Sequence, residues 1–475
     1  MDEDPIETAI GRFGKYQTWI LFLISVGWFP CEYQLNNVVF LIPSVEYKCL
    51  DNNVTNYCPC NNPEYDTSTI VSSVTSEWDL ICNRTHLASL AQSMMQIGIL
   101  FGSLLFGYFS DRSGRKSVVL TSLILEVVFI IISAVVPYFW LLLVCQFLIG
   151  VAIGGSMLSC YILAVELCGK SFRPYLSGLL EVSFLISYIT LPIIAYFVRD
   201  WRQLQLVTSV PWIIVIVYYW LIPESPRWLI TVGRKKEAID ILTHIAKKNN
   251  RPTDNIEAIV EKVELLNKID SKNQQKVTYI DLFRTPKIRV YTIITALIWM
   301  FCSHTFFGIN QYIGRLQGNL YLNVLLSAAC LTPGLIIVII ATLRLRRKVS
   351  IISSFTTAAV SLLVFIFIPS DMRAATLAFA IIGLIGAYTS FVQVYLYSSE
   401  IFPTVIRNTA LGFSSMFARF GSFIAPFVVN IGIEWVSILI FSSVAFSAAI
   451  LCYFLPETKA TTLPNTIKQR EQAEM

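Results

Sequence analysis

Two charged signatures occur in each half of this 475-residue chain, about half its length apart. Acidic and basic groups at a fixed spacing can form ion pairs, and a duplicated set can form two equivalent groups of pairs. A repeat on this scale also predicts that one structural unit has been duplicated. The first copies are Glu166-Leu-Cys-Gly-Lys-Ser-Phe-Arg173 and Pro223-Glu224-Ser225, and the second copies are Glu400-Ile-Phe-Pro-Thr-Val-Ile-Arg407 and Pro456-Glu457-Thr458.

A second kind of candidate is a charge placed within an apolar stretch. Arg419 lies in the apolar segment 408–430, about 16 Å from its start along a helix that rises about 1.5 Å per residue. A charge near the centre of a membrane is costly and is a functional candidate by default. Its planar guanidinium suits a carboxylate, and we expect Arg419 to bind an acidic substrate group. The alternative is a structural ion pair with Glu32 or Glu181.

Polar and aromatic residues within the apolar segments complete the candidate binding site. Glu32 and Glu181 could bind a cationic group, couple a proton or pair with a buried arginine. Asn37 could bind substrate or join two helices, and Glu126 has no assigned role. Aromatic rings accommodate flat organic groups and attract ammonium ions, although helix packing explains them equally well. The aromatic candidates are Phe184, Tyr188, Phe306, Phe307, Tyr388, Phe391 and Tyr395.

The elements that must position these residues are membrane helices. Apolar residues make up 55% of the chain and charged residues only 14%, compared with about 25% charged residues in soluble domains. Stretches near or above the roughly 20 residues that cross a bilayer predict an all-α membrane protein with twelve transmembrane helices in two six-helix halves. The predicted segments are 18–42, 86–109, 117–136, 139–162, 175–198, 203–222, 290–309, 320–343, 349–368, 374–397, 408–430 and 433–455.

Basic residues predict the orientation of these helices. Lys and Arg gather in the loops around 112–116, 170–173 and 344–348, whereas the turns 136–139 and 430–433 hold none. Because Lys and Arg concentrate on the cytoplasmic side, we expect both termini in the cytosol. The acidic, polar start of the chain indicates no cleaved signal peptide.

The expected domains follow from this pattern. A cytosolic segment 1–17 precedes the first half at 18–222, and a cytosolic tail at 457–475 follows the second half at 288–456. The linker 223–287 interrupts the apolar pattern, with 13 Lys and Arg against 9 Asp and Glu. We expect short amphipathic cytosolic helices there, with a disordered tether as the alternative for 268–277. Their apolar faces contain Ala238, Ile241, Leu242, Ile245 and Ala246, and then Ile256, Ile259, Val260 and Val263.

The loop 43–85 is predicted to lie outside the cell. It contains four cysteines, and in an oxidising compartment these suggest two disulfides with three possible pairings. It also holds the sequons at Asn53 and Asn83, which predict glycosylation. The alternative is free thiols and chance sequons. The four cysteines are Cys49, Cys58, Cys60 and Cys82.

The stretch Gly107-Tyr-Phe-Ser-Asp111-Arg112-Ser-Gly114-Arg115-Lys116 resembles the loop between helices 2 and 3 of the major facilitator superfamily. Gly114 permits a tight turn. The resemblance implies gates that control alternating access. In the second half, Leu343–Lys348 keeps the basic residues but lacks the Asp and the Gly, which predicts a weaker lock. The expected gating residues are Asp111, Arg112, Gly114, Arg115, Glu166, Arg173, Glu224, Arg227, Glu400, Arg407 and Glu457.

Further motifs, in order along nearly the whole chain, resemble the organic cation, organic anion and carnitine transporter family. Arg419 stands where the anion and carnitine members of that family place an arginine, and Leu331 where many members carry an acidic residue. The loop 43–85 is shorter than is usual in the family. The motifs are Gly11-Arg-Phe-Gly-Lys-Tyr-Gln17, Ser76-Glu-Trp-Asp-Leu-Ile-Cys82, Trp201-Arg202, Pro223-Glu-Ser-Pro-Arg-Trp-Leu229, Asp281-Leu-Phe-Arg-Thr-Pro286, Gly318-Asn-Leu-Tyr321 and Leu455-Pro-Glu-Thr458.

The resemblance implies transport of small organic ions, and the residues favour organic anions or carnitine-like zwitterions. An organic cation transporter is the first alternative, and a sugar-type porter or a membrane sensor of the same fold is the second. The three histidines are isolated, and the chain has neither a His-Glu-x-x-His nor a Gly-x-Ser-x-Gly motif. We therefore expect no enzyme activity, cofactor, metal or nucleic-acid partner. The expected partners are a small organic ion, the lipid bilayer and a coupling ion, and the expected location is the plasma membrane.

Overall fold

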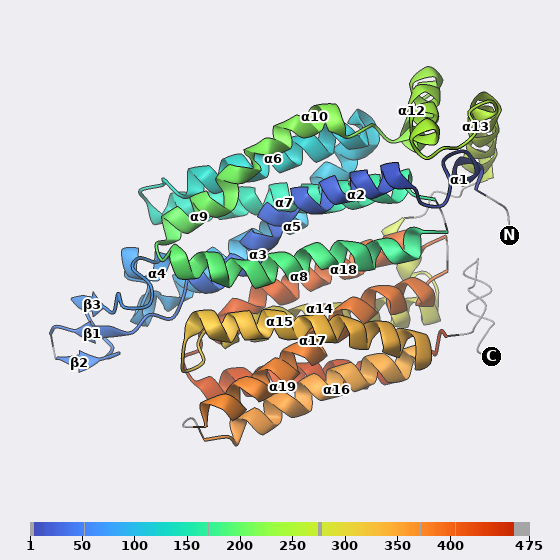
Figure 1. Ribbon diagram of the computed structural model, residues 1–475. Helices are drawn as coiled ribbons and strands as arrows, with labels where there is room; N and C mark the ends of the chain where they lie inside the picture. The colour runs from blue at the N-terminus through green and yellow to red at the C-terminus, as the bar shows by residue number, and fades with distance from the viewer. Residues whose placement is uncertain are drawn as a thin grey trace. The chain divides into compact units, whose positions relative to one another are not determined.

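The computed structural model describes residues 4–51, 53–169, 171–273, 278–369, 372–403 and 405–459. Most of these residues are helical, and eleven helical stretches among them are long and apolar enough to cross a membrane (Figure 1). They are α5 (Thr85–Ser113), α6 (Arg115–Ser133), α7 (Phe139–Leu167), α8 (Arg173–Phe197), the run of α9 (Trp201–Ser209), η2 (Val210–Val217) and α10 (Tyr218–Leu221), α14 (Pro286–Ile313), α15 (Leu320–Arg344), α16 (Arg347–Ile366), α17 (Arg373–Ile401), α18 (Arg407–Val429) and α19 (Glu434–Tyr453).

The first predicted segment, 18–42, is interrupted. It forms α2 (Lys15–Gly27) and α3 (Phe29–Leu41), with Trp28 between them. Pro30 explains the break, because proline has no N–H to donate to the carbonyl of Val26 and its ring crowds the preceding turn. The sequence therefore predicted the apolar stretch correctly but missed the break within it.

The chain packs as two compact units. Unit 1 consists of the described residues of Met1–Asn36, Gly98–Tyr188 and Arg202–Gln275, and unit 2 of those of Asn37–Ile97, Ile189–Trp201 and Lys276–Met475. The expected halves, 18–222 and 288–456, stay a prediction; within unit 2 the stretch around the loop packs with the C-terminal helices. Within unit 2, Ser93 Oγ donates to the carbonyl of Phe423 at 2.7 Å, and Tyr321 Oη donates to that of Thr69 at 2.8 Å.

Small residues allow close helix packing in each unit. In unit 1, a Cβ on Gly102 of α5 would collide with the backbone of Val151 on α7. In unit 2, a Cβ on Gly421 of α18 would collide with the backbone of Met300 on α14. Small residues let membrane helices approach closely and gain van der Waals contact where no water drives them together.

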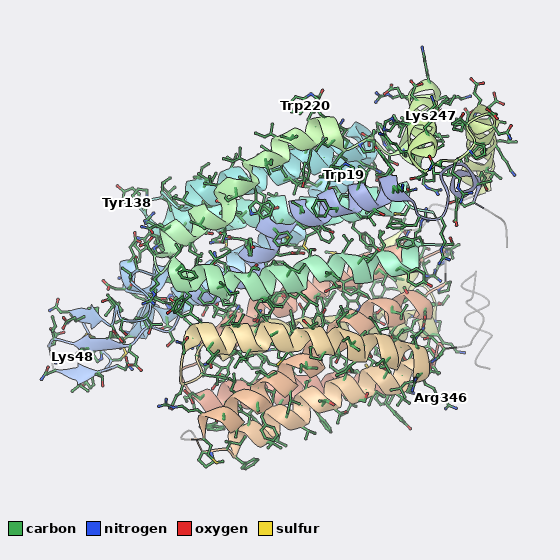
Figure 2. All side chains as sticks on the ribbon, in the orientation of Figure 1. Trp19, Lys48, Tyr138, Trp220, Lys247 and Arg346 are labelled. Atoms are coloured by element: carbon green, nitrogen blue, oxygen red, sulfur yellow. A yellow bond between two sulfur atoms is a disulfide. The ribbon has the colours of Figure 1, made fainter. Side chains whose placement is uncertain are left out.

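Large apolar side chains cover the outside of the spanning helices. Trp220 is 71% exposed, Tyr138 67% and Trp19 46%, and Figure 2 shows all three pointing away from the ribbon. Exposed apolar surface on this scale is unusual in a soluble monomer. It fits helices that face lipid.

The predicted amphipathic helices of the linker are present. They are α12 (Lys235–Lys248) and α13 (Ile256–Asn273), and the short helices α1 (Pro5–Ile10) and α11 (Pro226–Thr231) accompany them in unit 1. Their apolar faces are buried as expected, including Leu242 at 0% and Val260 at 1% exposure. Of the proposed tether, residues 274–277 lie outside the described part of the chain, and 268–273 belong to α13.

The loop 43–85 forms a small sheet held by two disulfides. Strands β1 (Tyr47–Cys49), β2 (Val54–Thr55) and β3 (Pro63–Tyr65) are antiparallel in the order β2-β1-β3. The disulfides join Cys49 to Cys60 and Cys58 to Cys82, which selects one of the three pairings that the sequence allowed. Hydrogen bonds from Asn61 N–H and Asn62 hold the pKa of Asp51 below its usual value. The loop ends in the short helices α4 (Val74–Glu77) and η1 (Cys82–Arg84).

Candidate functional site

Glu224 caps the N-terminus of α6 in unit 1. Its Oε1 accepts hydrogen bonds from the backbone N–H groups of Arg115 at 2.9 Å, Lys116 at 3.0 Å and Ser225 at 2.9 Å. The first N–H groups of a helix have no partner within the helix, and a carboxylate there also interacts favourably with the helix dipole. Gly114 makes this approach possible, because its φ is +97° and a Cβ would collide with Glu224 Oε2.

Arg115 joins three elements in the same place. Its guanidinium pairs with Glu166 at the end of α7 at 3.2 Å and with Asp111 at the end of α5 at 2.7 Å. The Glu166 side chain is only 17% exposed, whereas that of Asp111 is 77% exposed. The indole of Trp228 donates to the carbonyl of Asp111 at 2.9 Å. We call Asp111, Arg115, Glu166 and Glu224 the first clamp.

Unit 2 contains the same arrangement in its own residues. Arg347 pairs with Glu400 at 3.2 Å, and Glu457 accepts from the N–H groups of Arg347 at 2.9 Å and Lys348 at 3.1 Å. Thr458 Oγ1 donates to Glu400 at 2.6 Å. These four residues, Arg347, Glu400, Glu457 and Thr458, form the second clamp. As expected, the second clamp has no counterpart of Asp111. Glu457 nevertheless caps the N-terminus of α16 as Glu224 caps that of α6.

The remaining predicted gating residues lie elsewhere. Arg227 pairs with Asp4 near α1, and Arg112 lies over the ring of Tyr108 at 4.3 Å. The sequence placed Arg173 and Arg407 with the glutamates of their motifs, but those glutamates pair with Arg115 and Arg347 instead. Within the described residues, Nε of Arg173 and Nη2 of Arg407 are buried without a hydrogen-bond partner.

The aromatic candidates of α14 and α17 form one cluster in unit 2. Phe306 stacks with Phe391 at 5.4 Å between ring centroids, and Phe307 meets Phe306 edge to face at 5.3 Å. Tyr395 lies 5.8 Å from Phe391 and 4.3 Å from Trp299. Sequence reasoning missed Trp299, although it lies about two turns before the predicted Phe306 on the same helix. Tyr388 is 6.2 Å from Phe306 and 1% exposed.

Arg419 lies in the middle of α18, away from the face that packs on α14. That face contains the buried residues Ala418, Gly421 and Ser422, whereas Arg419 is partly exposed. Among the residues of unit 2 that the structure describes, Arg419 has no acidic partner.

The acidic candidates lie in unit 1. Glu32 on α3 is 5% exposed, and its Oε1 lies 2.9 Å from Ser183 Oγ on α8. Glu181 is partly exposed on α8. Tyr188 is buried at 1% exposure and meets Phe184 at 5.9 Å. Asn37, assigned to unit 2, is fully buried.

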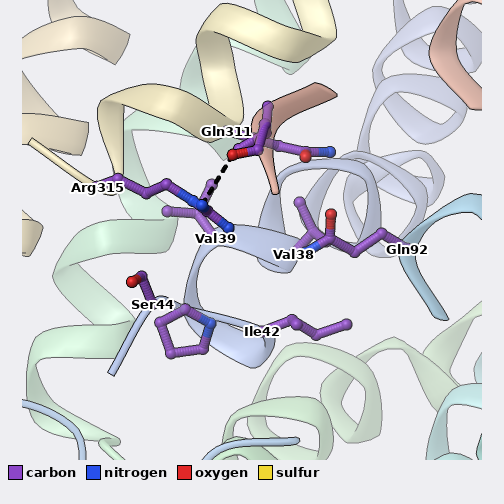
Figure 3. Close-up of a pocket in the computed structure, with 10 residues that line it drawn as sticks. Val38, Val39, Ile42, Ser44, Gln92, Gln311 and Arg315 are labelled. Atoms are coloured by element: carbon purple, nitrogen blue, oxygen red, sulfur yellow. Dashed lines mark hydrogen bonds between the residues drawn. The ribbon is translucent and has the colours of Figure 1, made fainter. Parts of the chain in front are cut away.

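A small pocket lies in unit 2 near the end of α14. Figure 3 shows Arg315 and Gln311 on one side, with Ser44, Ile42 and Gln92 on the other. Arg315 donates to the carbonyl of Val429 at 2.9 Å and to Asn430 Oδ1, so its guanidinium is already engaged. The complete lining is Val38, Val39, Ile42, Pro43, Ser44, Gln92, Gln311, Gly314, Arg315 and Val429.

Comparisons with known proteins identify the family. Residues 35–467 match the family described as "Sugar (and other) transporter". The "Organic cation transporter protein" of Drosophila melanogaster is 31% identical over 519 residues, which cover 99% of this chain and 95% of that protein. The chain belongs to the organic cation, organic anion and carnitine transporter family of the major facilitator superfamily. The human "Organic cation/carnitine transporter 2" is 29% identical, with 98% of this chain and 94% of that protein covered.

Solved structures agree on the fold. The inward-open conformation of the xylose transporter XylE from E. coli matches with a TM-score of 0.70 over 94% of this chain and 98% of that chain, at 17% identity. The predicted twelve-helix major facilitator fold is therefore confirmed, with its first helix broken at Trp28. This member of the family is a multi-pass membrane transporter of small molecules, and its relatives are transporters rather than enzymes.

Proposed function

We propose that the protein transports small organic ions across the plasma membrane by alternating access, and that it prefers organic anions or carnitine-like zwitterions. The observation that carries this preference is Arg419, a mid-helix guanidinium without an acidic partner among the described residues of unit 2. An ionised side chain in a membrane span is expensive unless it is paired or used. A substrate carboxylate would supply the missing partner in a bidentate geometry.

The aromatic cluster supports an organic substrate. Phe306, Phe391, Tyr395 and Trp299 present ring faces and edges within a few ångströms of one another in unit 2. Such rings bind flat organic groups by apolar contact and attract a quaternary ammonium by cation–π interaction. In a zwitterion, Arg419 would bind the carboxylate, and rings or a glutamate would bind the cationic end.

An organic cation is the second candidate substrate. The names of the Drosophila and human relatives include organic cations, and the aromatic cluster suits such substrates. Against this candidate stands Leu331 on α15, which is fully buried at the position where the family often carries an acidic residue. Arg419 in the middle of a membrane helix would also repel cations more strongly than the screened charges in the loop 43–85 attract them.

The test is an uptake panel with labelled carnitine, a dicarboxylate, an aromatic anion and a quaternary ammonium ion. Arg419→Ala should lower carboxylate uptake by at least about 30-fold, as expected for loss of a contact of about 2–5 kcal/mol, and spare any cation uptake. Arg346→Ala is the control, because Arg346 is exposed at the start of α16 (Figure 2). Wild-type uptake of simple quaternary ammonium ions without carboxylate uptake would show that Arg419 has a structural role.

The clamps and the topology complete the proposal. We place both termini, the linker helices and the two clamps in the cytosol, and the disulfide-bonded loop outside. The supporting observation is the identical chemistry of the two clamps, each a glutamate that caps a helix and an arginine that binds a second glutamate. Breaking and reforming such contacts would open and close the cytosolic side of the transporter.

A further inference from the structure

Three sequence motifs that belong neither to the clamps nor to the candidate binding site meet at one place in unit 2. They are the loop-end motif Ser76–Cys82, Trp201, and the motif Gly318–Tyr321. The first two are joined directly, because the indole of Trp201, which is 1% exposed, donates to Glu77 Oε2 at 2.8 Å. All three motifs surround the loop segment 68–72, which we call the loop strap.

The turn between α8 and α9 binds the loop strap through backbone groups. Val71 N–H donates to the carbonyl of Arg199 at 3.0 Å, and Trp201 N–H donates to the carbonyl of Ser72 at 3.2 Å. Nη1 of Arg199 also donates to the carbonyl of Ser68 at 3.2 Å. These partners and the strap all belong to the predicted first half of the chain, so the strap is fixed to that half.

Tyr321 binds the loop strap from the predicted second half. Its Oη donates to the carbonyl of Thr69 at 2.8 Å. Its ring stacks on Phe40 of α3 with 5.8 Å between centroids, and it meets Tyr196 of α8 edge to face at 5.5 Å. Tyr321 is 7% exposed. One residue of the second half therefore touches three segments of the first half.

The residues before Tyr321 explain its position. Gly318 has a φ of +118°, a conformation that glycine adopts at little cost. The side chain of Asn319 accepts from the N–H of Leu322 at 3.1 Å and so caps the N-terminus of α15. The turn and the cap begin α15 at this point and place Tyr321 in its first turn. The motif Gly318–Tyr321 thus presents a hydroxyl group at a helix end.

The two sides of the loop strap are bound with different strength. A transporter built from two repeats alternates access largely by rocking one repeat against the other, so contacts between the repeats at one end must break when that end opens. The strap is bound to the first half by backbone pairs and by Arg199. Its contact with the second half depends on the hydroxyl group and the ring of Tyr321. The contact with Tyr321 is therefore the weaker one.

We propose that Tyr321 is a gating residue, whose contact with the loop strap holds the extracellular side of the transporter closed. When that side opens, Tyr321 releases Thr69, and the strap stays on the turn between α8 and α9. The alternating access and the orientation in this proposal rest on the proposed function. The disulfide-bonded loop 43–85 is then part of the gate, because it carries the strap.

The accessibility of a cysteine placed at Val39 tests the gate without any substrate. Val39 is 5% exposed in the small pocket of Figure 3, and a Cβ on Gly314 of the second half would collide with it. Cells that express full-length Val39→Cys are treated with a membrane-impermeant thiol reagent, and the parent chain gives the background. Adding Tyr321→Phe removes the hydrogen bond to Thr69 and keeps the ring. It should speed labelling about two- to tenfold, as expected for one hydrogen bond between neutral groups. An unchanged labelling rate would overturn the proposal.

Two further variants separate gating from a general loss of stability. Tyr138→Phe removes a hydroxyl group from a tyrosine that is 67% exposed, and it should leave the labelling rate unchanged. Arg199→Gln should speed labelling less than Tyr321→Phe does, because the backbone pairs still hold the strap. A larger effect of Arg199→Gln would place the break on the other side of the strap and refute the assignment. Faster alkylation of the fully buried Cys160 in Tyr321→Phe would show general loosening and also refute it.

Uptake by the same cells tests the proposed function separately. Tyr321→Phe should change the initial rate of uptake but keep the ranking of substrates. A changed ranking would place Tyr321 in the binding site and refute a gating role. Wild-type cells that take up no organic ion of the panel would refute the proposed function, whereas the labelling rates test the contact between Tyr321 and the loop strap on their own.

Discussion

Replacing Glu224 by glutamine should slow transport more than any change at the exposed end of the first clamp. Glu224 Oε1 accepts three backbone hydrogen bonds at the start of α6. Glutamine keeps an oxygen acceptor but removes the charge. A hydrogen bond to a charged group contributes about 1.5–3 kcal/mol and a neutral one about 0.5–1.5 kcal/mol, and the helix dipole adds about 0.3–1 kcal/mol.

These contributions are not additive, and about 2 kcal/mol is a reasonable total for the lost charge. This corresponds to a change of about 30-fold in the population of the clamped state, since about 1.4 kcal/mol is a factor of ten. Asp111→Asn provides the internal comparison. The Asp111 side chain is 77% exposed in its pair with Arg115, so its loss should cost about 0.3–0.5 kcal/mol and lower the rate about twofold.

The assay is the initial uptake rate in proteoliposomes with matched amounts of protein. Glu224→Gln and its counterpart Glu457→Gln should both lower the rate strongly, Asp111→Asn should lower it slightly, and none should change the ranking of substrates. An Asp111→Asn effect as large as that of Glu224→Gln would show that burial and bond number do not determine the strength of the clamp. A changed ranking of substrates at a normal rate would show that the clamp belongs to the binding site.

Two further predictions concern the backbone and the loop. Gly114→Ala should lower the melting temperature in detergent by several degrees, because alanine is strained at a φ of +97° and displaces Glu224. Gly178→Ala is the control and should leave the melting temperature unchanged, because its added Cβ would meet nothing within 4 Å. Equal effects of the two substitutions would contradict this explanation. A glycosidase should increase the electrophoretic mobility of the protein from cells, unless Asn53 and Asn83 are both replaced by glutamine. The four loop cysteines should resist alkylation until they are reduced. Unchanged mobility together with thiols that react without reduction would contradict an extracellular loop.

The repeat in the sequence predicted more of the structure than any single motif did. Each half of the sequence has a glutamate at the end of one long apolar segment and a Pro-Glu pair after a later one. This repeat predicted two similar sites, and the structure contains both. The expected weaker lock in the second half stays a prediction, since no rate distinguishes the two. Sequence alone did not assign Glu224 and Glu457 to helix caps, because a cap depends on where the following loop returns in space.

Side-chain partners were the least predictable feature. The motif Glu-x6-Arg suggested that Glu166 belongs with Arg173, but the structure pairs it with Arg115, more than 50 residues away in sequence. The disulfide pairing was open for the same reason, since four cysteines allow three pairings. Likewise, no sequence pattern predicted that Ser156 contacts Glu126 or that Ser183 contacts Glu32. These contacts depend on how each helix is rotated about its own axis in the packed structure.

The charges of this transporter separate into two classes by their place along the helices. Those at helix ends, such as Arg115 and Arg347, have several partners each, and these contacts offset the cost of burying their guanidinium groups. Among the described residues, Arg419 and Glu126 lie in the middle of helices and Glu32 lies near the start of α3, and no oppositely charged partner is seen for any of the three within its own unit. Folding gains nothing from an unpaired charge in a membrane. A transporter retains such groups when something else binds them, and for Arg419 we propose a substrate carboxylate.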